Sequence, residues 1–134
     1  MSALSPLSAS LLVALGGGGG AVARYQLGRG MTHWLGASAT AAFPWATLAC
    51  NVIGSLAMGV LVGWLAQRGG VEGARLLVGV GLLGGFTTFS AFSMELALLI
   101  ERGMPGLAFS YAAVSLLAGL AALFVGLFAM RGLA

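Results

Sequence analysis

Four long apolar stretches constrain the fold of this chain more than any other feature. A helix needs about 20 consecutive apolar residues to cross the hydrocarbon core of a bilayer. Stretches of this length cover residues 7–27, 44–67, 74–100 and 105–130. The linkers between them are too short to hold a further domain. The sequence therefore predicts an all-α membrane protein with four transmembrane helices, which form a single domain over residues 1–134.

The composition supports a lipid surrounding. The 134 residues are 60% hydrophobic and 7% charged, whereas soluble domains carry about 25% charged residues. A chain this short cannot bury so much apolar surface in a soluble core, so the lipid bilayer is an expected partner. The 23 glycines are typical of membrane helices that pack closely. Because the sequence contains no dense basic run, no nucleic-acid partner is expected.

The arginines are divided evenly between the two sides of the predicted helices. One side has Arg24, Arg29 and Arg102, and the other has Arg68, Arg75 and Arg131. The orientation of a membrane protein depends mainly on the difference in Lys and Arg between its two sides. A balanced chain should insert in both orientations. We therefore predict dual topology and an antiparallel homodimer.

The second apolar stretch contains a polar stripe. Thr47, Asn51 and Ser55 follow one another at four-residue spacing, so they share one face of a helix. An Asn amide is costly to expose to lipid and must meet another helix, water or an ion. Two interpretations of Asn51 remain open, a hydrogen bond between helices and the wall of a narrow aqueous path.

The third apolar stretch contains the most informative segment, residues 84–93, with the sequence Gly-Gly-Phe-Thr-Thr-Phe-Ser-Ala-Phe-Ser. Two glycines followed by threonines and serines weaken a helix near the middle of residues 74–100. We therefore expect a third helix that is broken near the bilayer midplane. Carbonyl groups freed at such a break can bind a hard cation. The alternative is a continuous helix that packs through Gly81 and Gly85.

Aromatic and hydroxyl side chains could form an anion path. Phe89 and Phe92 are three residues apart, with Ser93 close by, and the positive edges of their rings could contact an anion weakly. Core packing is the other interpretation of this pair. In the fourth stretch, Tyr111 and Ser115 are an i,i+4 pair of hydroxyls, suited either to an anion or to hydrogen bonds between helices.

Two charged residues allow alternative roles. Arg24, near the end of the first predicted span, could attract anions at a vestibule or extend to the lipid headgroups. Glu95 is the acid that lies well inside a span, either as a neutral or paired structural acid or as a proton-sensitive group. Glu95 alone would support a proton-coupled exporter of cationic drugs. A structural subunit of a larger membrane complex is a further alternative.

An enzyme is not expected. The lone His33 falls in a predicted loop, and the sequence has no nucleophile–base pair and no metal-ligand spacing.

Three motifs together resemble the CrcB (Fluc) family of small fluoride channels. They are Gly19-Gly20-Ala21 through Arg24-Tyr25, Thr47-Leu48 through Asn51 and Gly54-Ser55, and residues 84–93. The resemblance covers essentially the whole chain. It implies a multi-pass protein of the bacterial inner membrane that passively exports fluoride from the cytoplasm and confers fluoride resistance.

The resemblance also implies an assembly and a set of site residues. The assembly is a dual-topology dimer with two antiparallel pores and a structural sodium ion at its centre, held by the backbone carbonyls of Gly84 and Thr87. Arg24 is assigned to the vestibule. The predicted fluoride pathway consists of Thr47, Asn51, Phe89, Phe92, Ser93, Tyr111 and Ser115. Ala91 departs from the family pattern, which has Thr or Ser between the two phenylalanines.

Overall fold

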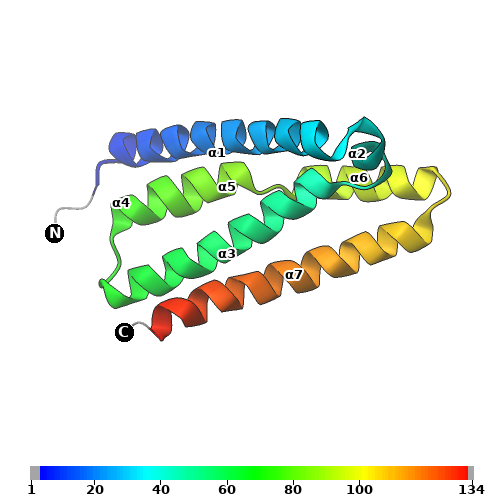
Figure 1. Ribbon diagram of the computed structural model, residues 1–134. Helices are drawn as coiled ribbons and strands as arrows, with labels where there is room; N and C mark the ends of the chain where they lie inside the picture. Colours follow the sequence, from blue (N-terminus) through cyan, green and yellow to red (C-terminus); the bar gives the residue numbers. More distant parts are fainter. Residues whose placement is uncertain (1–3, 133–134) are drawn as a thin grey trace.

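The computed structural model describes residues 4–132, and the regular secondary structure in this range is helical (Figure 1). Within this range, four helical stretches are long and apolar enough to cross a membrane, which confirms the prediction of an all-α protein with four transmembrane helices. Three of them are α1 (Pro6–Leu35), α3 (Trp45–Gln67) and α7 (Pro105–Arg131). The other, Glu72–Glu101, comprises α4 (Glu72–Ala74), the π-helical η1 (Arg75–Leu83), α5 (Gly84–Phe86) and α6 (Phe89–Glu101).

The first helix is longer than predicted. α1 continues to Leu35, and the short helix α2 (Ala37–Ala42) follows after Gly36, so most of the predicted loop over residues 28–43 is helical. Polar residues past position 27 predict the edge of the hydrocarbon core, but a helix satisfies its own backbone hydrogen bonds and can extend beyond that core. At about 1.5 Å per residue, its 30 residues span about 45 Å, compared with about 30 Å for that core.

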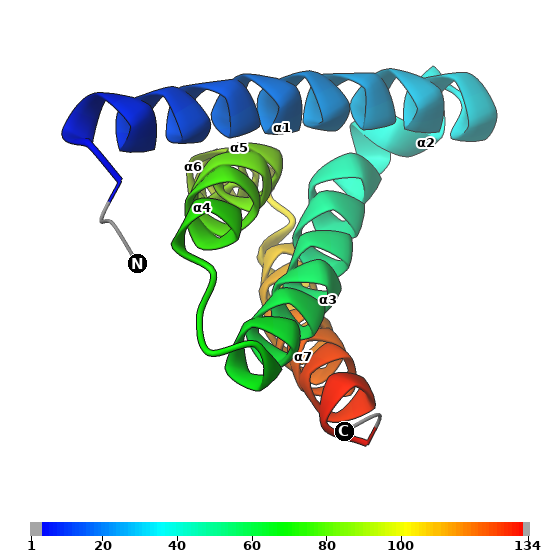
Figure 2. The ribbon, with the colours of Figure 1, turned by 90° about the vertical axis from the view of Figure 1, so that its left-hand side faces the viewer.

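Helix α1 packs against the first half of the third span (Figure 2). Gly16 and Gly20 are buried at this contact. A Cβ atom added to Gly16 would lie 2.1 Å from the Leu77 carbonyl oxygen, and one added to Gly20 would lie 2.0 Å from that of Leu82. Because no side chain fits there, glycine allows the two backbones to touch.

Helices α3 and α7 form a second close pair, which Figure 2 shows beside the first. A Cβ atom added to Gly59 would lie 2.0 Å from the Leu123 carbonyl oxygen, and one added to Gly126 would lie 2.3 Å from that of Leu56. Gly59, four residues after Ser55 on α3, and Gly126 on α7 are therefore packing residues.

The backbone of the third span changes conformation between α5 and α6. Thr87 and Thr88 are extended, with φ/ψ angles of −83°/160° and −153°/125°. The Thr88 hydroxyl accepts a hydrogen bond of 3.2 Å from the Ala91 N–H and caps α6. Opposite, a Cβ atom on Gly54 would lie 2.2 Å from the Thr87 methyl carbon. The absence of a side chain at Gly54 thus makes room for Thr87 beside α3.

A small buried cluster joins α6 to α7. Its members are Phe92, Leu99, Ala108 and Tyr111. Helix α1 begins, and helix α7 ends, at the same end of the bundle (Figure 1). Many large apolar side chains on the outside of the chain are exposed, as suits a surface that faces lipid or another copy.

Candidate functional site

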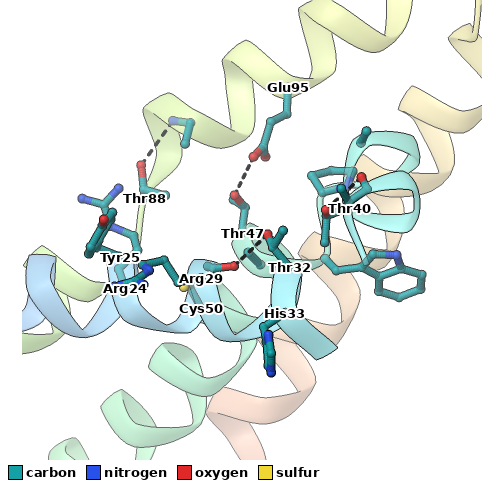
Figure 3. Close-up of a pocket in the computed structure, with 17 residues that line it drawn as sticks. Arg24, Tyr25, Arg29, Thr32, His33, Thr40, Thr47, Cys50, Thr88 and Glu95 are labelled. Carbon is teal, nitrogen blue, oxygen red and sulfur yellow. Dashed lines mark hydrogen bonds between the residues drawn. The ribbon is translucent and has the colours of Figure 1, made fainter. Parts of the chain in front are cut away.

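Two cavities adjoin the extended residues between α5 and α6. The larger, here called the arginine cavity, has a volume of about 850 Å³, and its lining includes Arg24, Arg29, His33, Thr47, Thr88 and Glu95 (Figure 3). The smaller, here called the phenylalanine cavity, has a volume of about 320 Å³, and its lining includes Asn51, Ser55, Thr88, Phe89, Phe92 and Ser115. Thr88 lines both cavities, so the extended segment forms part of the wall of each.

Asn51 binds the backbone of Thr88 at two points. Its Nδ2 donates to the Thr88 carbonyl oxygen at 3.1 Å, and its Oδ1 accepts from the Thr88 N–H at 2.9 Å. Asn51 therefore makes hydrogen bonds between helices and also lines the phenylalanine cavity, so both interpretations of this residue describe part of its surroundings. An amide NH₂ carries two donors, and the bond to Thr88 uses one of them.

Two carbonyl groups at the extended segment lose the donors that a continuous α-helix would supply. The Thr88 N–H, four residues after Gly84, donates to Asn51. The Ala91 N–H, four residues after Thr87, donates to the Thr88 hydroxyl. At Gly84 and Thr87, a side chain therefore binds the N–H group that would bond to the carbonyl in a continuous helix.

Arg24 lies in the interior of α1, because this helix continues past the predicted span to Leu35. It lines the arginine cavity, and its Nε donates to the Gly85 carbonyl oxygen at 3.3 Å. The side chain therefore extends to the third span, and the headgroup interpretation does not describe this contact.

Glu95 accepts hydrogen bonds from two other helices. The Thr47 hydroxyl donates to one carboxylate oxygen at 2.6 Å, and the Tyr111 hydroxyl donates to the other at 2.8 Å. Figure 3 shows Thr47 and Glu95 pointing toward each other beside the cavity. Tyr111 is fully buried. Of the roles considered for Glu95, the geometry matches a hydrogen-bonded structural acid that also faces the arginine cavity.

The two phenylalanines differ in their surroundings. Their ring centroids lie 5.8 Å apart on the same helix, but Phe92 is 8% exposed and Phe89 is 77% exposed. The Phe92 ring also packs 5.2 Å from the Tyr111 ring. Phe92 is therefore both a core residue and a cavity wall, whereas most of the Phe89 ring faces outward.

The two serines of the predicted pathway have different surroundings. Ser115 lines the phenylalanine cavity, and its buried hydroxyl has no hydrogen-bond partner among residues 4–132. Ser93 is exposed, donates to the Phe89 carbonyl oxygen at 2.9 Å, and belongs to neither of the two cavity linings. The structure thus brings Ser115 together with Asn51 and Phe92 and places Ser93 apart from them.

Replacing Glu95 with leucine should destabilise the protein. The buried Tyr111 hydroxyl and the Thr47 hydroxyl would lose their acceptor, at a cost of about 1–3 kcal/mol for each unsatisfied group. Glu95→Gln keeps one acceptor oxygen and should cost less. Thermal unfolding of the purified protein measures the difference, with the exposed Glu101→Gln as the control. Equal stability of Glu95→Leu and the unmodified chain would contradict this assignment.

The four apolar helices, the polar groups between them and the two cavities define a multi-pass membrane protein. Residues 11–127 match the family described as "CrcB-like protein, Camphor Resistance (CrcB)". The chain belongs to this family, which agrees with the resemblance found in its motifs.

Several bacterial relatives are similar over nearly their whole length. A protein of Novosphingobium aromaticivorans is 59% identical over 128 residues, which cover 96% of this chain and 100% of the relative. One of Erythrobacter litoralis is 56% identical, with 98% of each chain covered. One of Caulobacter vibrioides is 49% identical, with 90% and 94% covered. Each is named "Fluoride-specific ion channel FluC", so the relatives are channels, as expected for a chain that is not an enzyme.

Proposed function

We propose that this protein is a channel that conducts fluoride passively across a bacterial inner membrane. The observation that carries the proposal is the unpartnered Ser115 hydroxyl, buried in the wall of the phenylalanine cavity beside Asn51 and Phe92. A hydroxyl, an amide donor and the edge of an aromatic ring can together replace part of the water around a small anion. The names of the relatives supply the ion, fluoride.

The proposed path begins in the arginine cavity. The positive charges of Arg24 and Arg29 line this cavity and would raise the local concentration of anions. The ion then passes Thr88, which lines both cavities, and reaches Asn51 and Ser115. Several weak contacts in series favour conduction over tight binding. No covalent step is required. The drug-exporter alternative loses support because two hydroxyls already occupy the Glu95 carboxylate.

The proposal includes a second copy of the chain in the opposite orientation, with two antiparallel pores per dimer. The even division of arginines supports mixed insertion. Phe89 lines the phenylalanine cavity, yet its side chain is 77% exposed. This exposure supports a pore wall to which a second copy of the chain contributes. An antiparallel pair would supply the same surface from both copies.

Labelling in intact cells tests the dual topology. With Ser5→Cys in a Cys50→Ala chain, an impermeant maleimide should label about half of the molecules, since balanced charges favour neither orientation. Labelling after lysis gives the total and controls for reactivity. Complete labelling or no labelling in intact cells would show a single orientation.

A structural sodium ion at the dimer centre is part of the proposal. Sodium prefers oxygen ligands, and residues 4–132 contain no cluster of three His, Cys, Asp or Glu side chains that could hold a metal ion. The carbonyls of Gly84 and Thr87 fit the ion because their helical donors are taken by Asn51 and Thr88. When bound, the ion would interact with these carbonyl oxygens in place of their missing hydrogen-bond donors, and it would join the two copies.

Export from cells tests the proposed role in fluoride resistance. In a bacterium without its own fluoride exporter, the chain should lower intracellular fluoride and restore growth in fluoride medium. Phe92→Ile, which keeps an apolar side chain but removes the ring edge, should abolish the protection while the protein is still found in the membrane. Growth that does not depend on the unmodified chain would contradict the role.

A further inference from the structure

We infer that Arg24 is a positioning residue that holds the end of α5 by binding the Gly85 carbonyl, and thereby leaves the carbonyls of Gly84 and Thr87 for a cation. The inference rests on the proposed function, since it concerns the same cation site. It gives Arg24 a role beyond that of a vestibule charge. The contact that carries it is the Nε hydrogen bond of 3.3 Å to the Gly85 oxygen.

The sequence of α1 places Arg24 at this point. Gly16, Gly20 and Arg24 follow one another at four-residue spacing, so they share one face of the helix. The two glycines bring the α1 backbone into direct contact with η1. The next turn of the same face therefore lies beside the end of α5, where the Arg24 side chain meets Gly85. Side chains at positions 16 and 20 would push α1 away from the third span, and Arg24 would then lie farther from Gly85.

Three carbonyl groups near the end of α5 differ in whether they accept a hydrogen bond from Arg24 or have lost a helical donor. Gly85 binds Arg24. The helical donors of Gly84 and Thr87 are taken by Asn51 and by the Thr88 hydroxyl. A positive charge at the C-terminal end of a helix is also favourable, because the helix dipole is negative there. Arg24 thus binds the Gly85 carbonyl, one of the two that lie between the proposed ligands, and holds the backbone at that point.

Two substitutions separate the donor of Arg24 from its charge. In glutamine, Nε2 is bonded to Cδ as Nε is in arginine, so Arg24→Gln keeps a donor at the same distance along the side chain and loses the charge. In Arg24→Met, a carbon atom without a donor takes that place. Arg29→Gln is the matched control, because Arg29 lines the same cavity and its recorded partner is the Tyr25 ring.

Hydrogen exchange tests the positioning without depending on transport. In purified dimers in choline buffer free of sodium, Arg24→Met should speed the exchange of the amides of residues 87–91 by about tenfold or more, as expected for the loss of a hydrogen bond to a charged group. Arg24→Gln and Arg29→Gln should change it by less than about threefold, a loss well below that of such a bond. The amides of α7 serve as the internal reference and should not change.

Fluoride efflux from liposomes gives the second readout. At saturating fluoride, Arg24→Met should need a higher sodium concentration for half-maximal flux, and Arg24→Gln should restore the sodium dependence of the unmodified chain. An equal loss in the Gln and Met variants would show that the charge matters and the donor does not. No change in either variant would show that neither matters, and each of these results would overturn the inference. If the unmodified chain conducts no fluoride, the proposed function fails, and hydrogen exchange still decides the role of Arg24.

Discussion

Gly20→Ala is expected to prevent the protein from reaching its native packing. The added methyl group would lie 2.0 Å from the Leu82 carbonyl oxygen and 2.7 Å from the Phe86 nitrogen. Both are backbone atoms, which cannot rotate away as a side chain can. Overpacking of a well-packed contact costs about 1–3 kcal/mol or more. We expect a large fall in the thermal unfolding midpoint and little monodisperse protein on size-exclusion chromatography.

The same glycine run supplies the control for this substitution. A Cβ atom on Gly18 meets nothing within 4 Å, so Gly18→Ala should be neutral or stabilise α1 by up to about 1 kcal/mol through its better helix propensity. An equal loss in both variants would mean that the glycines matter for helix flexibility and not for the contact between α1 and the third span.

Asn51→Leu should reduce fluoride flux by about 100-fold or more. The substitution removes both hydrogen bonds to the Thr88 backbone and one donor of the phenylalanine cavity. Two lost interactions of about 1.4 kcal/mol each correspond to this factor. Flux is measured in liposomes after the amount of reconstituted protein has been matched.

Ser55→Ala is the control for Asn51→Leu. Ser55 lies one turn further along α3 and lines the same cavity, but it does not bind the backbone of Thr88. Its flux should stay within about threefold of the unmodified chain, since it loses less than one full interaction of this kind. Normal flux in Asn51→Leu would show that the hydrogen bonds between Asn51 and Thr88 are not needed for conduction.

The four spans were predictable because membrane solvation acts on long stretches of sequence. Residues 44–67 and 105–130 agree with α3 and α7 to within a residue at each end. The first helix is longer than the predicted span, because polar residues at positions 28–35 signal the edge of the membrane and not the end of the helix. Hydropathy locates the hydrocarbon core and does not fix where helical hydrogen bonding stops.

The contacts of the site were less predictable than its residues. Asn51, Phe92 and Ser115 were identified from polar or aromatic side chains in apolar surroundings, and the structure places all three at one cavity. The partners of Glu95 were missed, because Thr47 is 48 residues away and Tyr111 is 16 residues away in sequence. No local pattern encodes such a contact.

The role of Arg24 had a signal that sequence reasoning did not use. Its spacing of four residues from Gly20, and of eight from Gly16, places it on the face of α1 that approaches another backbone. What that face meets is set by the packing of α1 against η1 and α5. In other membrane helices, an arginine that follows buried glycines at four-residue spacing could therefore be tested for a hydrogen bond to a carbonyl of a neighbouring helix.

Anion efflux from liposomes that contain the purified protein tests the central claim most directly. A fluoride electrode follows fluoride loss after valinomycin opens a path for potassium, and chloride-loaded liposomes are the control. The proposed function predicts rapid fluoride loss that requires the protein, with chloride loss equal to that of liposomes without protein. No fluoride loss from liposomes that contain the folded protein, or equal loss of chloride and fluoride, would contradict a fluoride-selective channel.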